Sequence, residues 1–175
     1  MASHVKLVLI IVSVFALIFL GRHHGQRFRT ASAGDPFPPS ITGRADPIDG
    51  DSLWVGDDEV RLKGIDAPEW KQDCRRDGLS WRCGMAARET LVGLIGSNDV
   101  TCAISERDVY GRMLGRCTAG DRNLNAEMVA SGMAVAYGSY WNEQGKARAA
   151  RKGLWSGEFE EPRAWRAQRA SEDER

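Results

Sequence analysis

Short apolar runs separated by tight polar turns dominate residues 48–70, IDGDSLWVGDDEVRLKGIDAPEW. The turns DGD and GDD divide this region in the way that turn residues separate β-strands. We therefore expect strands at residues 42–48, 52–55 and 59–65. The run VGDDEV, with polar turn residues between apolar neighbours, is the pattern of a β-hairpin. A chain that opens in this way is expected to build a small sheet.

The remainder of the domain alternates between helices and one further pair of strands. Apolar positions in residues 85–95 fit an amphipathic helix that ends at a glycine. Residues 100–104 and 113–117 are expected to pair as strands, and residues 124–132 and 143–155 to form helices closed by glycines. This order suits a small Greek-key barrel of the OB type, although periodicity alone does not single out that topology. We therefore expect an α+β domain, a five-stranded OB-fold barrel with about three helices.

The first 22 residues are of a different kind. Residues 5–21, VKLVLIIVSVFALIFLG, carry no charge after Lys6 and are almost wholly apolar. This run is longer than a typical signal-peptide core and close to the roughly 20 residues of a membrane span. A small-residue site, ASA at residues 31–33, lies well beyond it, so we expect an uncleaved signal anchor rather than a cleaved signal or a buried core helix. The expected organisation is an anchor (1–22), a linker (23–41), a domain (42–157) and a charged C-terminal tail (158–175).

The four cysteines, all in the expected domain, bear on the compartment. Cys102 and Cys117 flank the turn-like DVYGR symmetrically, as cross-strand partners do, and Cys74 and Cys83 bracket a short polar loop. A zinc site is the alternative, but no CxxC or Cys-His spacing favours it. Two disulfides indicate an oxidising compartment, so the domain is expected outside the cytoplasmic membrane, periplasmic or secreted. The basic residues after the apolar run favour the opposite orientation by the positive-inside rule.

The charge of the domain limits the kind of nucleic-acid binding that is possible. The whole chain has a formal net charge of zero, but its first 33 residues hold four basic and no acidic residues. The remainder therefore has 20 basic against 24 acidic residues. Proteins that coat nucleic acid are usually basic, because phosphate neutralisation supplies most of their affinity. A high-affinity coat protein is disfavoured, whereas an enzyme with a local cationic clamp is not.

Several carboxylates stand where expected strands begin or end. Asp49 and Asp51 precede one strand, and Asp66 and Glu69 follow another. Oxygen ligands without a nearby His or Cys suit a hard cation such as calcium or magnesium. The spacing is not that of an EF-hand, and Asp-Gly is also a common turn sequence, so a purely structural role for these residues stays open at this point.

Three motifs in order, DGDS at 49–52, RLKGIDAPE at 61–69 and DVYGR at 108–112, resemble the thermonuclease, or staphylococcal-nuclease-like, family. The resemblance covers residues 42–155, nearly all of the chain beyond its N-terminal segment. It implies an OB barrel and a nuclease that hydrolyses phosphodiester bonds of DNA or RNA with one calcium ion. The expected partners are then the nucleic acid and, through the N-terminal helix, the membrane, and the chain is expected to act as a monomer.

The resemblance also implies a metal site and a general base. Asp51 and Asp66 match the family's side-chain ligands of calcium, and Ala67, where the family usually has threonine, would supply a main-chain carbonyl. Glu69 matches the catalytic glutamate, which activates or orients the attacking water. The plain alternative for Glu69 is that it caps the next element after a proline.

Four further residues are implied to contact the substrate. Arg61 and Arg112 match the arginines that hold the scissile phosphate, and Tyr110 and Tyr137 match tyrosines that line the nucleotide pocket. Arginine suits the first task because its planar fork grips two oxygens at once. The plain alternatives are that Arg61 faces solvent and that Arg112 pairs with Asp108.

A second function remains possible for a chain of this kind. Residues 70–84, WKQDCRRDGLSWRCG, carry a cysteine pair and two tryptophans that the family's prototype lacks, and they could reshape the substrate cleft. The alternative is a catalytically weak or inactive, membrane-tethered binding or scaffold module, linked to envelope or exopolysaccharide processes. Loss of Glu69 or of either arginine would be its signature, and none is lost, so the enzyme is favoured.

Overall fold

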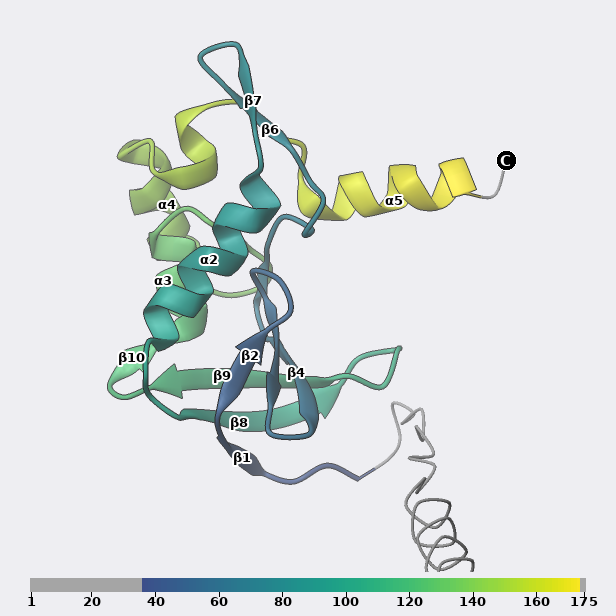
Figure 1. The fold of residues 1–175 in the computed structure, drawn as a ribbon, viewed down its shortest axis with the longest axis vertical. Helices are drawn as coiled ribbons and strands as arrows, with labels where there is room; N and C mark the ends of the chain where they lie inside the picture. Colours follow the sequence, from purple (N-terminus) through teal and green to yellow (C-terminus); the bar gives the residue numbers. More distant parts are fainter. Residues whose placement is uncertain (1–35, 174–175) are drawn as a thin grey trace, which may run out of the picture. The chain divides into compact units, whose positions relative to one another are not determined.

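Seven strands form one mixed sheet in the computed structural model, which describes residues 36–173 (Figure 1). The strands are β1 (Ser40–Gly43), β2 (Ala45–Pro47), β3 (Ser52–Val55), β4 (Asp58–Leu62), β8 (Val100–Arg107), β9 (Met113–Ala119) and β10 (Arg122–Asn123). Their order is β1-β8-β9-β4-β3-β2, with β10 paired to β9. Neighbouring strands are antiparallel except β4 and β9, which run parallel.

The sheet is strongly curled, because its two end strands are consecutive in the chain. Only Arg44 separates β1 from β2, yet β1 pairs with β8 and β2 pairs with β3. Among residues 36–173 the strand order remains an open path and does not form the closed five-stranded barrel that the sequence predicted. The α+β class is confirmed, and the arrangement is consistent with an OB-like fold.

Two small antiparallel sheets extend this framework. Strand β5 (Ile65–Asp66) pairs with β11 (Val135–Ala136), and β6 (Cys74–Arg76) pairs with β7 (Leu79–Trp81). The first pairing fixes the backbone on which Asp66 stands. The second is a hairpin within the segment that the sequence had singled out for its cysteines and tryptophans.

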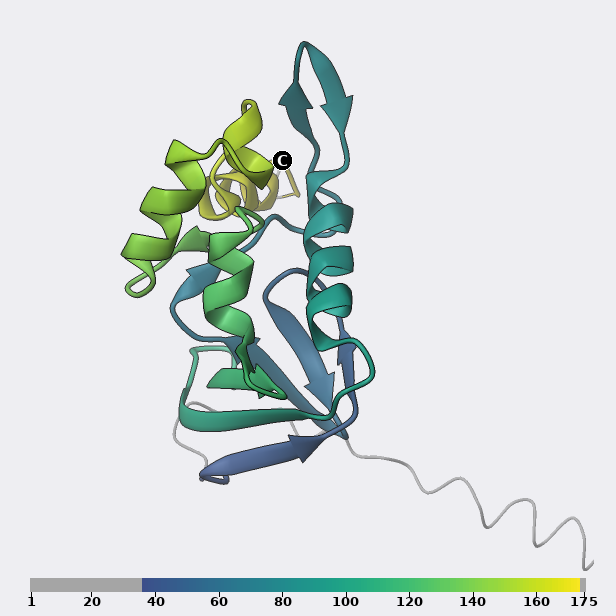
Figure 2. The ribbon, with the colours of Figure 1, turned by 90° about the vertical axis from the view of Figure 1, so that its left-hand side faces the viewer.

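Four α-helices and one short 3-10 helix are found among the described residues. They are α2 (Cys83–Ile95), α3 (Leu124–Ala130), α4 (Trp141–Ala149), η1 (Gly153–Ser156) and α5 (Pro162–Asp173). Helix α3 begins where the Asn123 side chain accepts a hydrogen bond from the Ala126 amide, and α2 ends at Gly96 with a positive φ of 59°. Figure 2 shows α2 and α3 side by side above the curled sheet.

The helix expected at residues 143–155 is divided into α4 and η1. Arg151 and Gly153 adopt positive φ values of 50° and 53°, which an α-helix does not accommodate. Gly153 there approaches Gly132 so closely that a Cβ on it would lie 2.5 Å from the Gly132 carbonyl oxygen. The turn between the two helices therefore depends on glycine at residue 153.

The structure describes most of the C-terminal segment but not the first 35 residues. The expected signal anchor, residues 1–22, and most of the expected linker lie outside the described residues. Within residues 36–173, no helix combines the length and apolar character needed to cross a membrane. The segment expected to be a charged tail, from residue 158, contains helix α5.

The main core lies between the curled sheet and helices α2 and α3. It is built from the inward side chains of β3, β4, β8 and β9 together with one face of each helix. Fully buried members include Leu53, Val60, Leu91, Val100, Leu124 and Met128. A smaller cluster joins Cys74, Cys83, Val135 and Leu154 under the β6–β7 hairpin, so this hairpin is tied to the helical side of the domain.

Both predicted disulfides are present. Cys102 and Cys117 stand directly opposite each other on β8 and β9, and their sulfurs are bonded. Cys74, at the start of β6, is bonded to Cys83, the first residue of α2. The zinc alternative is therefore set aside for these four residues, and none of them is a free thiol.

Replacing Cys102 and Cys117 together by alanine is expected to lower the free energy of unfolding by about 3 kcal/mol. The reason is that the bond joins residues 15 apart and so closes a loop in the unfolded chain. The sequence separation is 15 residues for this bond and 9 for Cys74–Cys83. The double variant at Cys74 and Cys83 is therefore expected to lose less through chain entropy. Urea denaturation of the full chain measures both, and an unchanged free energy of unfolding in the first variant would contradict the prediction.

Candidate active site

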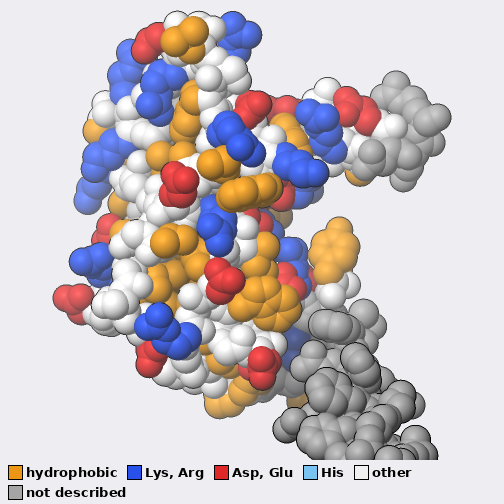
Figure 3. Space-filling view, viewed as in Figure 1, with side chains coloured by type: hydrophobic (Ala, Val, Ile, Leu, Met, Phe, Trp, Pro, Cys, Tyr) orange, Lys and Arg blue, Asp and Glu red, His pale blue; other side chains and the backbone are white. Residues whose placement is uncertain are grey.

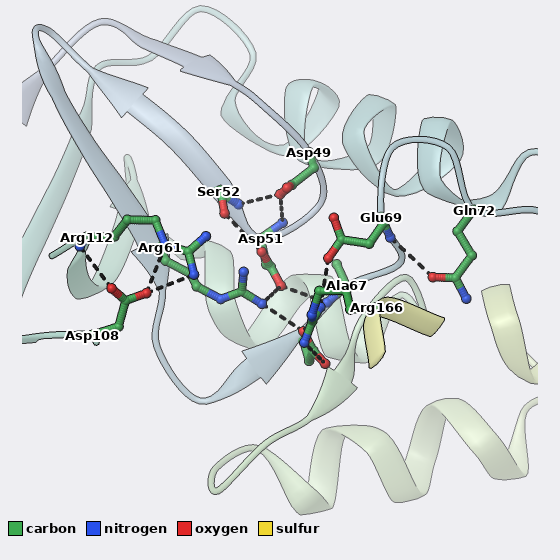
Figure 4. A network of polar contacts seen from close by, with 11 residues as sticks. Asp49, Asp51, Ser52, Arg61, Ala67, Glu69, Gln72, Asp108, Arg112 and Arg166 are labelled. Carbon is green, nitrogen blue, oxygen red and sulfur yellow. Dashed lines mark hydrogen bonds and ion pairs between the residues drawn. The ribbon is translucent and has the colours of Figure 1, made fainter. Parts of the chain in front are cut away.

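The first turn of the site is organised by Asp49. Its Oδ1 accepts hydrogen bonds from the amides of Asp51 (2.9 Å) and Ser52 (2.7 Å), forming an Asx turn that leads into β3. Gly50 is needed within it, since a Cβ there would lie 2.7 Å from the Cβ of Ala67. The turn therefore packs closely against the residue that follows β5, and the Asp51 side chain is directed toward the interior (Figure 4).

Asp51 is almost completely buried, with an exposed fraction of 2%. Its Oδ1 accepts from the Ser52 hydroxyl (3.1 Å), and its Oδ2 accepts from the Ala67 amide (2.8 Å) and from Nη2 of Arg61 (2.7 Å). Burial raises the pKa of Asp51 from 3.8 to about 7; the charge of Arg61 opposes this rise, and neighbouring carboxylates, first that of Asp49, add to it. A buried carboxylate of this kind is stabilised in its ionised form by additional positive charge.

Arg61, on β4, joins Asp51 to Asp66. Oδ2 of Asp51 and Oδ1 of Asp66 both lie 2.7 Å from the same nitrogen, Nη2 of Arg61. The two oxygens are therefore no more than twice this distance apart, which is compatible with two ligands of one calcium ion at about 2.3–2.6 Å each. The Arg61 side chain is only 16% exposed, so the solvent-facing alternative does not hold. The expected role of Arg61 at the phosphate remains a prediction.

Glu69 is held by the loop that follows β5. Its amide donates to Oε1 of the buried Gln72 (3.2 Å), and its carbonyl accepts from the Gln72 amide (2.7 Å). Gly84, near the start of α2, permits this arrangement, since a Cβ there would lie only 1.8 Å from the Glu69 carbonyl oxygen. The Glu69 backbone is therefore fixed by close packing, which positions its carboxylate on the cleft.

A cleft of about 770 Å³ opens over these groups. The parallel pairing of β4 with β9 sets Arg61 opposite Leu114, so Arg112, just before β9, lies on the same side of the sheet edge. The cleft brings together most of the side chains that the sequence singled out. They are Arg61, Asp66, Glu69, Tyr110, Arg112 and Tyr137.

Arg112 is positioned by Asp108, as its plain alternative anticipated. Nε and Nη2 of Arg112 both lie 2.8 Å from Oδ2 of Asp108, whose Oδ1 accepts from the amides of Tyr110 and Arg112 (2.9 Å each). The DVYGR turn is thus folded around the Asp108 carboxylate. Asp108 thereby orients the Arg112 guanidinium without burying it, and Arg112 stays on the wall of the cleft.

Two tyrosines offer exposed aromatic surface at the cleft. Tyr110 is 77% exposed and Tyr137 is 58% exposed, although both line the cavity. Aromatic rings exposed beside a cationic groove are surfaces on which nucleic-acid bases stack. The roles expected for these tyrosines, and for the Ala67 carbonyl, remain predictions.

Arg166 is the site residue that sequence reasoning missed. It reaches the cleft from α5, and its guanidinium makes two parallel contacts with Asp66, Nη1 to Oδ1 at 2.9 Å and Nη2 to Oδ2 at 3.0 Å, as well as a contact from Nη1 to Oε1 of Glu69 at 2.8 Å. Partial burial lowers the pKa of Arg166, but the hydrogen bonds to Asp66 and Glu69 raise it overall. The available signal was the three-residue spacing of Arg163, Arg166 and Arg169 after Pro162, which is typical of one helix face.

The donor set suits a hard cation, although it is incomplete by itself. Among residues 36–173, no three or more His, Cys, Asp or Glu side chains gather closely enough to hold a metal ion alone. Asp51 and Asp66 nevertheless present buried carboxylate oxygens at adjacent points, and such oxygens, completed by main-chain carbonyls and water, are what calcium prefers. The residues present therefore fit a calcium-type cation better than zinc or another soft metal.

Comparison with known proteins connects this geometry to a family. The family model described as staphylococcal nuclease homologue matches residues 59–157. The chain is 32% identical over 149 residues to the succinoglycan biosynthesis protein ExoI of Rhizobium meliloti (strain 1021), covering 81% of this chain and 76% of that protein. It is 38% identical over 120 residues to an uncharacterized endonuclease of Escherichia coli O157:H7, covering 62% of this chain and 72% of that protein.

A plant relative points the same way. The chain is 33% identical over 116 residues to the probable staphylococcal-like nuclease CAN2 of Oryza sativa subsp. japonica, covering 61% of this chain and 28% of that longer protein. The family and the names of two of these relatives support a nuclease-type, hydrolytic function. With more than half of its residues matched by the family model, the chain belongs to the staphylococcal nuclease homologue family.

Proposed function

We propose that this protein is a calcium-dependent nuclease that hydrolyses phosphodiester bonds of DNA, RNA or both. The observation that carries the proposal is the convergence of Arg61, Asp66, Glu69 and Arg112 on one cleft, with the buried Asp51 joined to it through Arg61. These residue types supply both a hard-cation site and a pair of phosphate-binding cations.

The carboxylates divide into two tasks. Asp51 and Asp66 would hold the calcium ion, with the main-chain carbonyl of Ala67 as a further ligand. The bound cation would offset the negative charge that builds on the phosphate oxygens as the bond is attacked. Glu69, at the rim of the same cleft and fixed by Gln72, would orient the attacking water and accept its proton.

The arginines act on the phosphate itself. A phosphodiester resists attack because its oxygens are negative, and a guanidinium binds two of them through parallel N–H groups. Arg61 stands on β4, and Arg112 lies in the turn just before β9, the strand that pairs with β4; the two would grip the scissile phosphate from two directions. Tyr110 and Tyr137 would stack against bases next to that phosphate, which suits a substrate read by its backbone more than by its sequence.

The two disulfides support a proposal for the compartment. Two bonded pairs are typical of proteins that fold in an oxidising environment. We propose that the domain acts as a monomer outside the cytoplasmic membrane, periplasmic or secreted, and that residues 1–22 anchor it there.

A nuclease assay on the full chain tests the proposed function. Cleavage of single- and double-stranded DNA and of RNA is expected in calcium, and it should fall to background when a calcium chelator is added in excess. Restoring calcium, but not an equal concentration of sodium, should restore cleavage because the carboxylates need a divalent partner. Cleavage that persists undiminished in excess chelator would contradict calcium dependence, and the lack of any cleavage in calcium would contradict the nuclease itself.

A second candidate function has one observation in its favour. The relative with the greatest coverage of this chain among those compared above is named a succinoglycan biosynthesis protein. This name connects that relative with the synthesis of an exopolysaccharide. The second candidate for this chain is therefore a membrane-tethered binding or scaffold module that takes part in exopolysaccharide processes. The two candidates separate in the same assay, because a binding module would retain nucleic acid or polysaccharide without cutting nucleic acid.

A further inference from the structure

Helix α5 lies beyond the part of the chain that the family model matches, yet it contributes directly to the cleft. The match ends at residue 157, whereas α5 spans Pro162–Asp173. Figure 3 shows the helix projecting from the body of the domain, with basic and acidic side chains along it. Pro162 is buried at its start and Trp165 and Arg166 are half-buried, while its other residues up to Glu172 are exposed.

The firm attachment of this segment lies before the helix rather than along it. Glu158 and Arg75 exchange two backbone hydrogen bonds of 2.8 Å, and the side chain of Gln72 donates to the Glu160 carbonyl (2.7 Å). The chain up to residue 160 is thereby fixed to the β6–β7 hairpin and to the loop before it. Beyond it, displacement of α5 would uncover little apolar surface, so it is inexpensive in free energy.

Arg166 is the main polar tether of α5 to the cleft. Its guanidinium occupies both oxygens of Asp66 and one oxygen of Glu69 at 2.8–3.0 Å. Charge-assisted, two-pronged contacts of this kind are the stronger hydrogen bonds of proteins. They engage one expected cation ligand and the expected base at the same time.

A divalent cation needs some of these same oxygens. Asp66 already receives Arg61 and Arg166, so a cation bound to it would sit beside two guanidinium groups. Like charges at such separations repel strongly when they are partly shielded from water. Arg61 is fixed within the sheet on β4, whereas Arg166 is carried by the exposed helix. Arg166 is therefore the group that yields.

We propose that Arg166 competes with the divalent cation for Asp66 and Glu69, and that α5 is a lid released from the cleft when the cation binds. The proposal rests on the proposed function only for the cation site, not for the cleavage reaction. Under this proposal, helix α5, which lies outside the part of the chain matched by the family model, sets the apparent affinity of the protein for the cation. Glu69 becomes accessible when the cation displaces Arg166.

Calcium titration of the full chain by isothermal calorimetry tests the competition. Arg166→Gln is expected to lower the Kd for calcium about tenfold, the change expected when the closed form accounts for about nine-tenths of the molecules. Arg169→Gln is the matched control, because it removes the same charge from the same helix at a residue that pairs with Glu172 and stacks on Trp165. An unchanged or higher Kd in Arg166→Gln, or no calcium binding by any of the three proteins, would overturn the proposal.

Hydrogen exchange provides a second readout that does not depend on the variant's affinity. Calcium is expected to speed amide exchange in α5 of the wild type, whereas Arg166→Gln should show fast exchange there without calcium. Helix α2, packed in the core, serves as the internal control. Equal or slower exchange in α5 after calcium binding would overturn the lid.

These readouts distinguish a failure of the lid proposal from a failure of the nuclease proposal. A wild type that binds calcium with the expected variant pattern but cleaves nothing would contradict the proposed function and support the competition. A wild type that cleaves in calcium while Arg166→Gln binds calcium with unchanged affinity would contradict the competition alone.

Discussion

Arg112→Lys is expected to reduce the turnover number about 10²–10³-fold, the loss typical of one positioned donor to a developing oxyanion. Lysine keeps the positive charge but lacks the planar fork that binds two phosphate oxygens together. Arg112 is well suited to this test because its ion pair with Asp108 is partly exposed, at 28% for the arginine side chain. Such pairs contribute little to stability, so the melting temperature should hardly move.

The control for this variant lies on β9, the strand that begins just after Arg112. Arg116→Lys makes the same chemical change at an exposed residue of β9 that does not line the cleft. Turnover of both variants is measured with saturating substrate and calcium, and melting temperature is measured alongside. If Arg112→Lys kept near-normal turnover, the role of Arg112 would be limited to its ion pair with Asp108. The binding-module function would then be favoured over the nuclease.

Arg61→Met is expected to lower the free energy of unfolding by about 3–5 kcal/mol when no calcium is present. Arg61 neutralises Asp51 and Asp66 in a largely buried position, and removing one partner of a buried ion pair leaves an uncompensated charge. Calcium should recover part of the loss, since a ligand that binds the folded state stabilises it. Denaturant unfolding with and without calcium measures both effects.

The same variant has a predicted pH dependence. The pKa of Asp51 in the folded chain, about 7, lies above its usual 3.8. The folded state therefore binds this proton more tightly than the unfolded state, and stability is lost as the pH rises through about 7. Arg61 opposes that rise in pKa. The destabilisation caused by Arg61→Met should therefore be larger above about pH 7, where Asp51 is ionised, and smaller well below it, where Asp51 is neutral.

A surface ion pair supplies the control for Arg61. Lys63 contacts Glu106 at 2.7 Å with both side chains substantially exposed, so Lys63→Met should change the free energy of unfolding by about 1 kcal/mol or less. A cost for Arg61→Met no greater than this would show that the buried carboxylates are compensated in some other way. The ion pairs of Arg61 with Asp51 and Asp66 would then not contribute to the free energy of unfolding.

Much of the site was predictable because its residues lie in short motifs at strand ends. Asp51 follows an Asp-Gly turn, Asp66 ends a strand, and Arg112 closes a turn folded on Asp108, so local sequence sets each of them. The Cys102–Cys117 bond was predictable for the same reason, since a hairpin places symmetric positions opposite each other.

The features that escaped sequence reasoning depend on contacts between distant segments. Arg166 meets Asp66 across 100 residues, and no local pattern encodes that contact. The open, seven-stranded path could not be read from periodicity, because the number and closure of strands depend on how β1 and β2 divide at Arg44. The break between α4 and η1 arises where Gly153 meets Gly132, a tertiary contact that overrides a continuous helical pattern.

The parallel pairing of β4 with β9 places the assembly of the cleft late in folding. Arg61 and the turn bearing Arg112 meet only through this pairing, although they are about 50 residues apart in the chain. Contacts between distant segments form late, because the intervening chain must be ordered first. A nascent or half-folded chain that has completed only the β3–β4 hairpin therefore has its acidic turn in place without an assembled cleft. The cleft lined by Arg61 and Arg112 is complete only after β9 has docked.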